Sequence, residues 1–196
     1  SREEMHFDDE TAARVVLSHS PPKSRFDDED TAYLTILRDP VSRGASLLRH
    51  VSARGSGARG NPEEILSSLS SAELNHATHL IGWQAGDDDL ERSLSRAKRR
   101  METDVAFFGL QERFSEFASL LACFVGLEGF IYPRFQVAEV KCEISDAVLE
   151  RLYERSLFDR DLYRFAESLY QERYSELFAD DAHLKPRQMR SYVALE

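Results

Sequence analysis

The stretch Tyr33-Leu-Thr-Ile-Leu-Arg-Asp-Pro-Val-Ser-Arg-Gly-Ala-Ser-Leu-Leu48 decides the fold of this chain. Its first part, residues 33–37, is an apolar and β-branched run that is too short for a free helix and typical of a strand buried on both faces of a parallel sheet. Asp39 is a natural helix N-cap, and Pro40 is a natural first helical residue. The sequence therefore predicts that a strand turns into a helix directly after Arg38.

This predicted junction favours the binding of an anion. The first N–H groups of a helix have no partners within the helix and lie at the positive end of its dipole. Arg38 stands at the carboxyl end of the strand, where ligands bind in open α/β sheets, and Ser46 follows two turns into the helix. We therefore expect backbone N–H groups, a guanidinium and a hydroxyl to face a bound anion.

Three segments resemble the carbohydrate-type sulfotransferases, which use 3′-phosphoadenosine 5′-phosphosulfate. The pattern Arg-Asp-Pro-x-x-Arg-x-x-Ser at 38–46 looks like the segment with which the family holds the 3′-phosphate of that nucleotide. Phe108-Gly-Leu-Gln-Glu-Arg-Phe114 is similar to a Gly-Leu-x-Glu-Arg-Phe stretch of the family, and Asp161-Leu-Tyr-Arg-Phe-Ala166 resembles one of its late helices. The three segments occur in the family order, and the resemblance covers about residues 15–170.

The resemblance implies one domain over residues 1–196, with the P-loop-like sulfotransferase fold and a helical C-terminal part. Alternating strand and helix patterns also predict an α/β fold, with a parallel sheet flanked by helices. The implied reaction transfers a sulfuryl group from 3′-phosphoadenosine 5′-phosphosulfate to a hydroxyl of a carbohydrate or another small acceptor, without a metal. Arg38 and Ser46 occupy the positions that contact the 3′-phosphate in the family.

A candidate general base lies before this junction. The run Arg14-Val-Val-Leu-Ser-His-Ser20 predicts a second buried strand, with His19 at its polar tip. If that strand is a parallel neighbour of residues 33–37, His19 lies at the same sheet edge as Arg38. The resemblance implies that such a histidine accepts the proton of the attacking hydroxyl, which imidazole can do near neutral pH. The alternative is a histidine that only ends a strand. Residues 1–10 lack periodicity and are interpreted as a loop or the tail of an earlier element.

Three residues are expected to contact the acceptor. Arg54 and Arg59 belong to a basic cluster after the first helix, where family members that act on acidic sugars carry arginines. Asn75 begins the segment Asn75-His-Ala-Thr-His-Leu-Ile-Gly82, which is similar to a family segment near the acceptor, although His79 replaces the usual arginine. An ordinary surface residue is the alternative in each case.

Local signals predict several further helices. Asn61 and Pro62 mark a helix start, and Ser70 with Glu73 forms a capping box. A helix that begins after Asp89 carries arginines on what we interpret as a solvated basic face, and two apolar stripes predict C-terminal helices. Glu112 and Arg113 are interpreted as structural. The arginines of the basic face are Arg92, Arg96, Arg99 and Arg100, and the stripes span 149–157 and 162–170.

The composition restricts the class of protein. Thirty-five acidic and 25 basic residues give a formal net charge of −10, which disfavours nonspecific binding to nucleic acid or to anionic membranes. No apolar run reaches the length of about 18 residues that a membrane span needs. Two cysteines without C-x-x-C spacing make a reducing cytoplasmic location the default.

The family's phosphate loop is missing from this sequence. Neither G-x-x-x-x-G-K-S/T nor a shorter Lys-x-Gly-Thr occurs, although the family grips the 5′-phosphosulfate with such a loop. We expect this loop and its strand to precede Ser1; if the natural protein also lacks them, the chain is an inactive relative. Two further alternatives are a helical protein-interaction module and a nucleotide-dependent phosphotransferase. The phosphotransferase would need a metal-binding acid at a strand end, and Asp39 is the one candidate.

Overall fold

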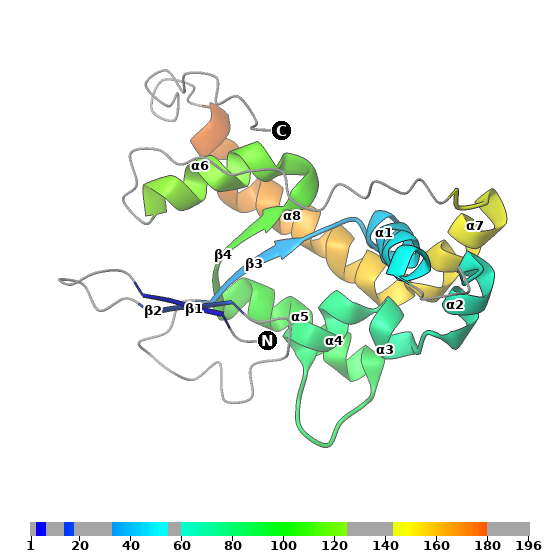
Figure 1. Ribbon diagram of the computed structural model, residues 1–196. Coiled ribbons are helices and arrows are strands. Elements are labelled where there is room, and N and C mark those ends of the chain that lie inside the picture. Colours follow the sequence, from blue (N-terminus) through cyan, green and yellow to red (C-terminus); the bar gives the residue numbers. More distant parts are fainter. Residues whose placement is uncertain (1–2, 7–13, 18–32, 55–59, 125–142, 180–196) are drawn as a thin grey trace.

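The computed structural model describes residues 3–6, 14–17, 33–54, 60–124 and 143–179, and this part is mixed α/β and mostly helical (Figure 1). The strands are β1 (Glu3–His6), β2 (Arg14–Leu17), β3 (Tyr33–Leu37) and β4 (Val105–Leu110). The helices are α1 (Pro40–Arg54), α2 (Pro62–Ser68), α3 (Ser71–Leu74), α4 (His76–Gly82), α5 (Leu90–Thr103), α6 (Phe114–Phe124), α7 (Asp146–Arg155) and α8 (Leu157–Ala179). A 3₁₀ turn (Gln111–Arg113) joins β4 to α6.

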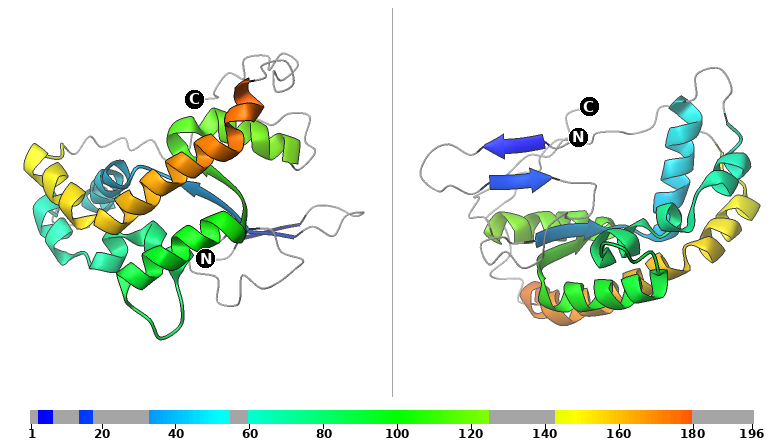
Figure 2. Two further views of the ribbon diagram at one scale, coloured as in Figure 1. Left: turned by 180° about the vertical axis from the view of Figure 1, so that it is seen from behind. Right: turned by 90° about the horizontal axis from the view of Figure 1, so that it is seen from below.

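The predicted strand at 33–37 is confirmed as β3, which pairs in parallel with β4. Leu37 lies opposite Leu110, so the residues that follow the two strands, Arg38 and Gln111, emerge at the same edge. Helix α8 crosses behind this pair in Figure 1 and in front of it in the left view of Figure 2, and it contacts β4. The parallel pair and α8 therefore frame the edge where a ligand site was expected.

The strand that precedes His19 was expected to lie beside residues 33–37, and this expectation is wrong. β2 pairs with β1 in a separate antiparallel two-stranded sheet, with Glu3 opposite Leu17, and not with β3. Residues 1–10 were interpreted as a loop or the tail of an earlier element, and residues 3–6 form the strand β1. An antiparallel pair needs only a short connection, whereas a parallel partner requires a crossover, so the nearby β1 is the easier neighbour for β2.

One face of β3 is more open than the sequence suggested. Leu34 and Ile36 share a face of the strand, and each is 42% exposed. Leu37, on the other face, is 4% exposed and belongs to the main core. The expectation of a strand buried on both faces is therefore wrong for the face of Leu34 and Ile36, because the main core gathers on the opposite side.

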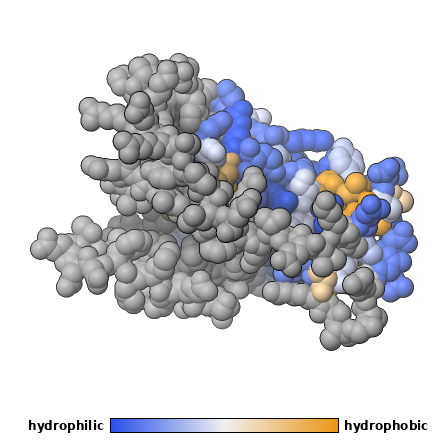
Figure 3. All heavy atoms as spheres, turned by 45° about the horizontal axis from the view of Figure 1, so that its top comes forward, coloured by the Kyte–Doolittle hydropathy of each residue, from blue (hydrophilic) through white to orange (hydrophobic). Residues whose placement is uncertain are grey.

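Two hydrophobic clusters hold the helices in place. The larger one packs β4 against α5, α6 and α8, and the rings of Phe108 and Tyr170 meet edge to face at 6.0 Å. The smaller one joins α1, α2, α3 and α7, which contribute the buried residues Leu48, Leu66, Leu74 and Leu152. The described surface in Figure 3 is mostly hydrophilic, with a hydrophobic area toward the end where α1 and α7 lie.

The predicted helix starts are confirmed. The Asn61 side chain accepts a hydrogen bond from the Glu63 N–H at 3.1 Å, and Ser70 forms a capping box with Glu73. Asp89 caps α5 by accepting from two backbone N–H groups. None of the described helices is both long and apolar enough to cross a membrane.

The basic face predicted on α5 is only partly solvated. Arg96 Nε donates to the Gly82 carbonyl at 2.8 Å, and Arg100 Nη1 donates to the Ile81 carbonyl at 2.6 Å. These carbonyls belong to the last turn of α4, where they lack partners within the helix. Two of the four arginines therefore cap a neighbouring helix, whereas Arg99 remains exposed.

Candidate functional site

The strand–turn–helix at Arg38 forms as predicted. β3 ends at Leu37, and α1 begins at Pro40, which is buried. The Asp39 side chain acts as the N-cap, because its Oδ1 accepts from the Ser42 N–H at 2.7 Å. The turn is therefore fixed locally by the residues that predicted it.

Glu112 crosses the edge of the sheet to reach this turn. Its Oε1 accepts from the Asp39 N–H at 3.0 Å, and its Oε2 accepts from the Tyr163 hydroxyl at 2.7 Å. One carboxylate thus connects the end of β4, the start of α1 and the first half of α8. Asp39, Glu112 and Tyr163 come from the three segments 38–46, 108–114 and 161–166.

The backbone N–H groups expected to bind an anion are mostly occupied. The Asp39 N–H is taken by Glu112, and the Ser42 N–H by the side chain of Asp39. The Arg43 N–H donates to the Asp39 carbonyl at 2.8 Å, and Pro40 has no N–H to offer. The expectation of a free helix start is therefore wrong, because the chain caps this helix itself.

Arg38 directly follows β3 at this edge. It is half-buried, and among the residues that the structure describes no carboxylate lies within ion-pair distance of it. Burial lowers the pKa of Arg43, Asp159 opposes that change, and the positive charge of Arg38 lowers the pKa further. The positive charges of Arg38 and Arg43 therefore act on each other at the start of α1.

Ser46 lies outside the buried face of α1. That face carries Ala45, Leu48 and Ser52, which are all buried, whereas Ser46 is half-buried and follows the exposed Ser42 by four residues. Positions four apart lie on the same side of a helix. The hydroxyl of Ser46 is therefore on the side of α1 that the core does not use.

Arg43, the second arginine of the pattern, is structural. Its Nη2 donates to the carbonyls of Glu73 and Leu74, each at 2.9 Å, and lies 3.8 Å from Asp159 Oδ2. These partners belong to α3 and α8. Arg43 therefore links α1 to α3 and α8, a role that the sequence pattern did not reveal.

Asn75 is not placed where an acceptor could reach it. It is 1% exposed, its Oδ1 accepts from the Phe158 N–H at 3.0 Å, and its Nδ2 donates to the Arg155 carbonyl at 2.9 Å. The Oδ1 also accepts from the Asp159 N–H at 3.1 Å. The structure thus corrects the acceptor interpretation of Asn75, because its amide is buried and bonded to the junction of α7 and α8.

The remaining candidates lie at or beyond the limits of the structure. His19 and Arg59 are outside the described residues, and Arg54 is the last residue of α1. Their roles as general base and acceptor contacts stay predictions. Within the described ranges, no three His, Cys, Asp or Glu side chains gather closely enough to hold a metal ion.

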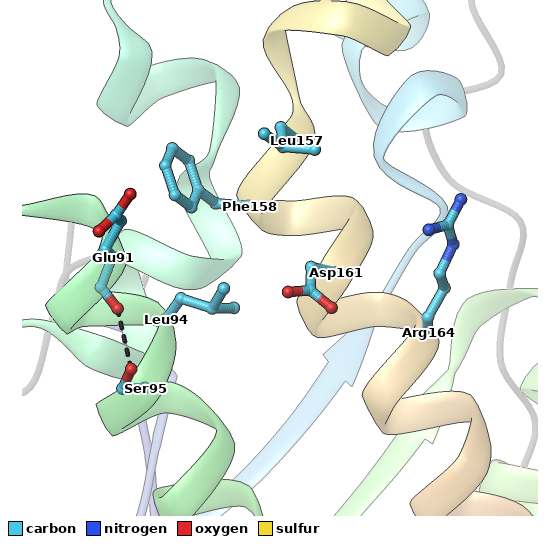
Figure 4. A pocket seen from close by; sticks show the side chains of 7 residues that line it. All are labelled: Glu91, Leu94, Ser95, Leu157, Phe158, Asp161 and Arg164. Atoms are coloured by element: carbon cyan, nitrogen blue, oxygen red, sulfur yellow. Dashed lines mark hydrogen bonds between the residues drawn. The ribbon is translucent and has the colours of Figure 1, made fainter.

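A pocket of about 390 Å³ lies elsewhere, between α5 and α8 (Figure 4). Asp161, on its wall, forms an ion pair with Lys98 at 3.1 Å. Asp161 and Tyr163 are two residues apart and therefore point to different sides of α8. The pocket is thus distinct from the edge at Arg38. It is lined by Glu91, Leu94, Ser95, Leu157, Phe158, Asp161 and Arg164.

Comparison with known proteins does not identify this site. No protein-family model matches the sequence, and no curated protein matches it. What is known of this site is the position of Arg38 and the contacts of Asp39, Glu112 and Tyr163.

Proposed function

We propose that this chain is part of a sulfotransferase that moves a sulfuryl group from 3′-phosphoadenosine 5′-phosphosulfate to a hydroxyl of a carbohydrate or another small acceptor. One observation carries the proposal. The Glu112 carboxylate accepts hydrogen bonds from both the Asp39 N–H and the Tyr163 hydroxyl. These residues are far apart in the sequence, and each belongs to one of the three segments that resemble the family. Their convergence beside Arg38 is what a shared site would require.

Arg38 and Ser46 are the proposed contacts of the 3′-phosphate. A guanidinium offers paired N–H donors that match the oxygens of a phosphate, and a hydroxyl adds a further donor. The chain as a whole carries a net charge of −10, so an anion needs a local cation such as Arg38. Arg38 directly follows β3, and Ser46 lies in the second turn of α1.

The proposed reaction is an in-line displacement at sulfur. A new bond forms between the acceptor oxygen and sulfur, while the bond between sulfur and the 5′-phosphate oxygen breaks. His19 takes the proton of the acceptor hydroxyl, and adenosine 3′,5′-bisphosphate leaves. Positioning and cationic groups supply most of the catalysis, as they do in phosphoryl transfer, and the scheme assigns no step to a metal ion.

The contacts of the described residues also bear on the alternatives of an interaction module and a phosphotransferase. A helical interaction module would expose its apolar stripes. The 162–170 stripe is buried at Leu162 and Tyr170, whereas Tyr153 and Leu157 of the 149–157 stripe are 48% and 55% exposed. A phosphotransferase would need Asp39 for a metal, but that carboxylate caps α1. If the natural protein lacks the phosphate loop, binding of the donor should be crippled, so the first test is binding.

Calorimetric titration with adenosine 3′,5′-bisphosphate tests the proposed site. We expect Arg38→Ala to weaken binding by about 2 kcal/mol, the cost of losing a hydrogen-bond partner with full charge. Arg99→Ala is the matched control, since Arg99 is exposed on α5 and should leave the affinity unchanged. Equal affinities for the wild-type protein and Arg38→Ala would reject the site.

A further inference from the structure

Glu112 binds the backbone directly after Arg38. Its hydrogen bond to the Asp39 N–H, at 3.0 Å, holds the peptide unit between Arg38 and Asp39. That unit is planar, so fixing its N–H also fixes the direction of the Arg38 carbonyl and restricts rotation about the bond next to the Arg38 Cα. The side chain of Arg38 leaves from that same Cα. Holding the Asp39 N–H therefore limits where the guanidinium can go.

Tyr163 holds Glu112 in turn. Its hydroxyl donates to Oε2 at 2.7 Å, so the carboxylate is fixed through both oxygens, one to α1 and one to α8. Burial, followed by the hydrogen bond to Glu112, raises the pKa of Tyr163. The phenol therefore keeps its proton near neutral pH and acts as a donor there.

We propose that Glu112 and Tyr163 are positioning residues for the 3′-phosphate, which act by holding the turn at Arg38 in its binding geometry. This inference rests on the proposed function and adds two residues to it. Neither residue needs to touch the nucleotide. Glu112 is an acceptor only and carries a negative charge, so a direct contact with a phosphate would be repulsive.

A role of the Glu112 charge must be separated from a role of its hydrogen bonds. Removing a carboxylate near an anion site strengthens anion binding through charge, whereas loss of positioning weakens it. Tyr163→Phe removes one hydrogen bond and changes no charge. Tyr153→Phe is the matched control, because Tyr153 is 48% exposed on α7 and its ring, which stacks on Arg160, is retained in phenylalanine.

The test compares adenosine 3′,5′-bisphosphate with adenosine 5′-monophosphate by calorimetry. The ratio of the two affinities isolates the contribution of the 3′-phosphate. We expect Glu112→Ala to lower this ratio about tenfold and Tyr163→Phe about threefold, in line with the loss of hydrogen bonds to a charged group. Tyr153→Phe should keep the wild-type ratio.

Three results would overturn the inference. If the ratio is unchanged in Glu112→Ala and Tyr163→Phe while Arg38→Ala lowers it, the positioning role is wrong and the proposed function stands. If both nucleotides lose affinity equally, the two residues support only the general fold. If the wild-type protein binds the two nucleotides with equal affinity, the proposed function itself fails and this inference fails with it.

Discussion

Asn75 and Asp159 cap each other's helices. The carboxylate of Asp159, at the start of α8, accepts from the N–H groups of Ala77 at 3.1 Å and Thr78 at 2.7 Å, in the first turn of α4. The Asn75 Oδ1, just before α4, accepts from the N–H groups of Phe158 and Asp159. Each helix thus receives from the other the acceptor that its own first turn lacks. This exchange fixes α4 against α8.

The mutual capping predicts that Asn75 is a stability residue. Asn75→Ala leaves buried N–H groups of α8 without an acceptor and should cost about 3 kcal/mol of unfolding free energy. Asn61→Ala removes an exposed N-cap of α2 and should cost about 1 kcal/mol. Urea denaturation of both variants measures the difference, and equal costs would contradict the role given to Asn75.

Asp159 should make stability depend on pH. Burial raises the pKa of its carboxyl, although the Thr78 N–H and the charge of Arg43 act in the opposite direction. A raised pKa means that the folded state binds the proton more tightly than the unfolded state. The stability that this group contributes is therefore complete below its unfolded pKa of about 4 and is lost as pH rises through the folded pKa.

The comparison variant for this effect is Asp159→Asn, which keeps an oxygen acceptor but cannot titrate. The difference in unfolding free energy between the wild-type protein and Asp159→Asn should become less favourable to the wild type from about pH 4 upward. A difference that grows in favour of the wild type with rising pH would mean that Arg43 and the backbone N–H groups outweigh burial.

The contact between α4 and α5 leaves no room for a side chain at Gly82. A Cβ atom there would lie 1.9 Å from the Ser93 carbonyl oxygen, which belongs to a helix backbone and cannot move aside easily. Gly82→Ala should therefore cost about 3 kcal/mol. Gly86 has open space around it but a φ of 76°, so Gly86→Ala should cost only about 1 kcal/mol. Thermal unfolding that ranks the two variants in the reverse order would disprove this close contact.

Two serines of α1 should behave in opposite ways. Ser46→Ala should weaken binding of adenosine 3′,5′-bisphosphate by about 1 kcal/mol with little change in stability. Ser52 is 5% exposed, and its hydroxyl donates to the Gly60 carbonyl at 3.1 Å. Ser52→Ala should therefore lower stability and leave the nucleotide affinity unchanged. Calorimetry and urea denaturation of the same two variants check both expectations, and an unchanged affinity of Ser46→Ala would remove Ser46 from the site.

The parts of the fold that depend on neighbouring residues in the sequence could be predicted. The apolar run at 33–37, followed by Asp39 and Pro40, correctly predicted a strand that turns into a capped helix. The capping box of Ser70 and Glu73 could be predicted equally well, because its two partners are three residues apart. These features follow local rules of hydrogen bonding and backbone geometry.

The pairing of distant segments could not be predicted in the same way. The run at Arg14–Leu17 indicates a strand but does not say which strand it joins, and the structure pairs it with β1. Arg96 and Arg100 looked like surface charges, since the sequence does not show that the end of α4 lies beside them. Asn75 looked like a ligand contact for the same reason, because the backbone that it binds is about 80 residues away.

Glu112 was interpreted as structural, and its link to the candidate site was missed. A signal for that link was present: Glu112 follows β4 by two residues, and the carboxyl ends of parallel strands meet at one edge. What the sequence could not supply was the register that sets Leu110 opposite Leu37 and so brings Glu112 to Asp39.

The most direct measurement combines Arg38→Ala with removal of the 3′-phosphate from the ligand. If Arg38 holds that phosphate, the substitution weakens the binding of adenosine 3′,5′-bisphosphate by about 2 kcal/mol. The affinity for adenosine 5′-monophosphate then stays unchanged. If Arg38→Ala costs the same for both nucleotides, or costs nothing for either, the cation at the end of β3 does not recognise a 3′-phosphate.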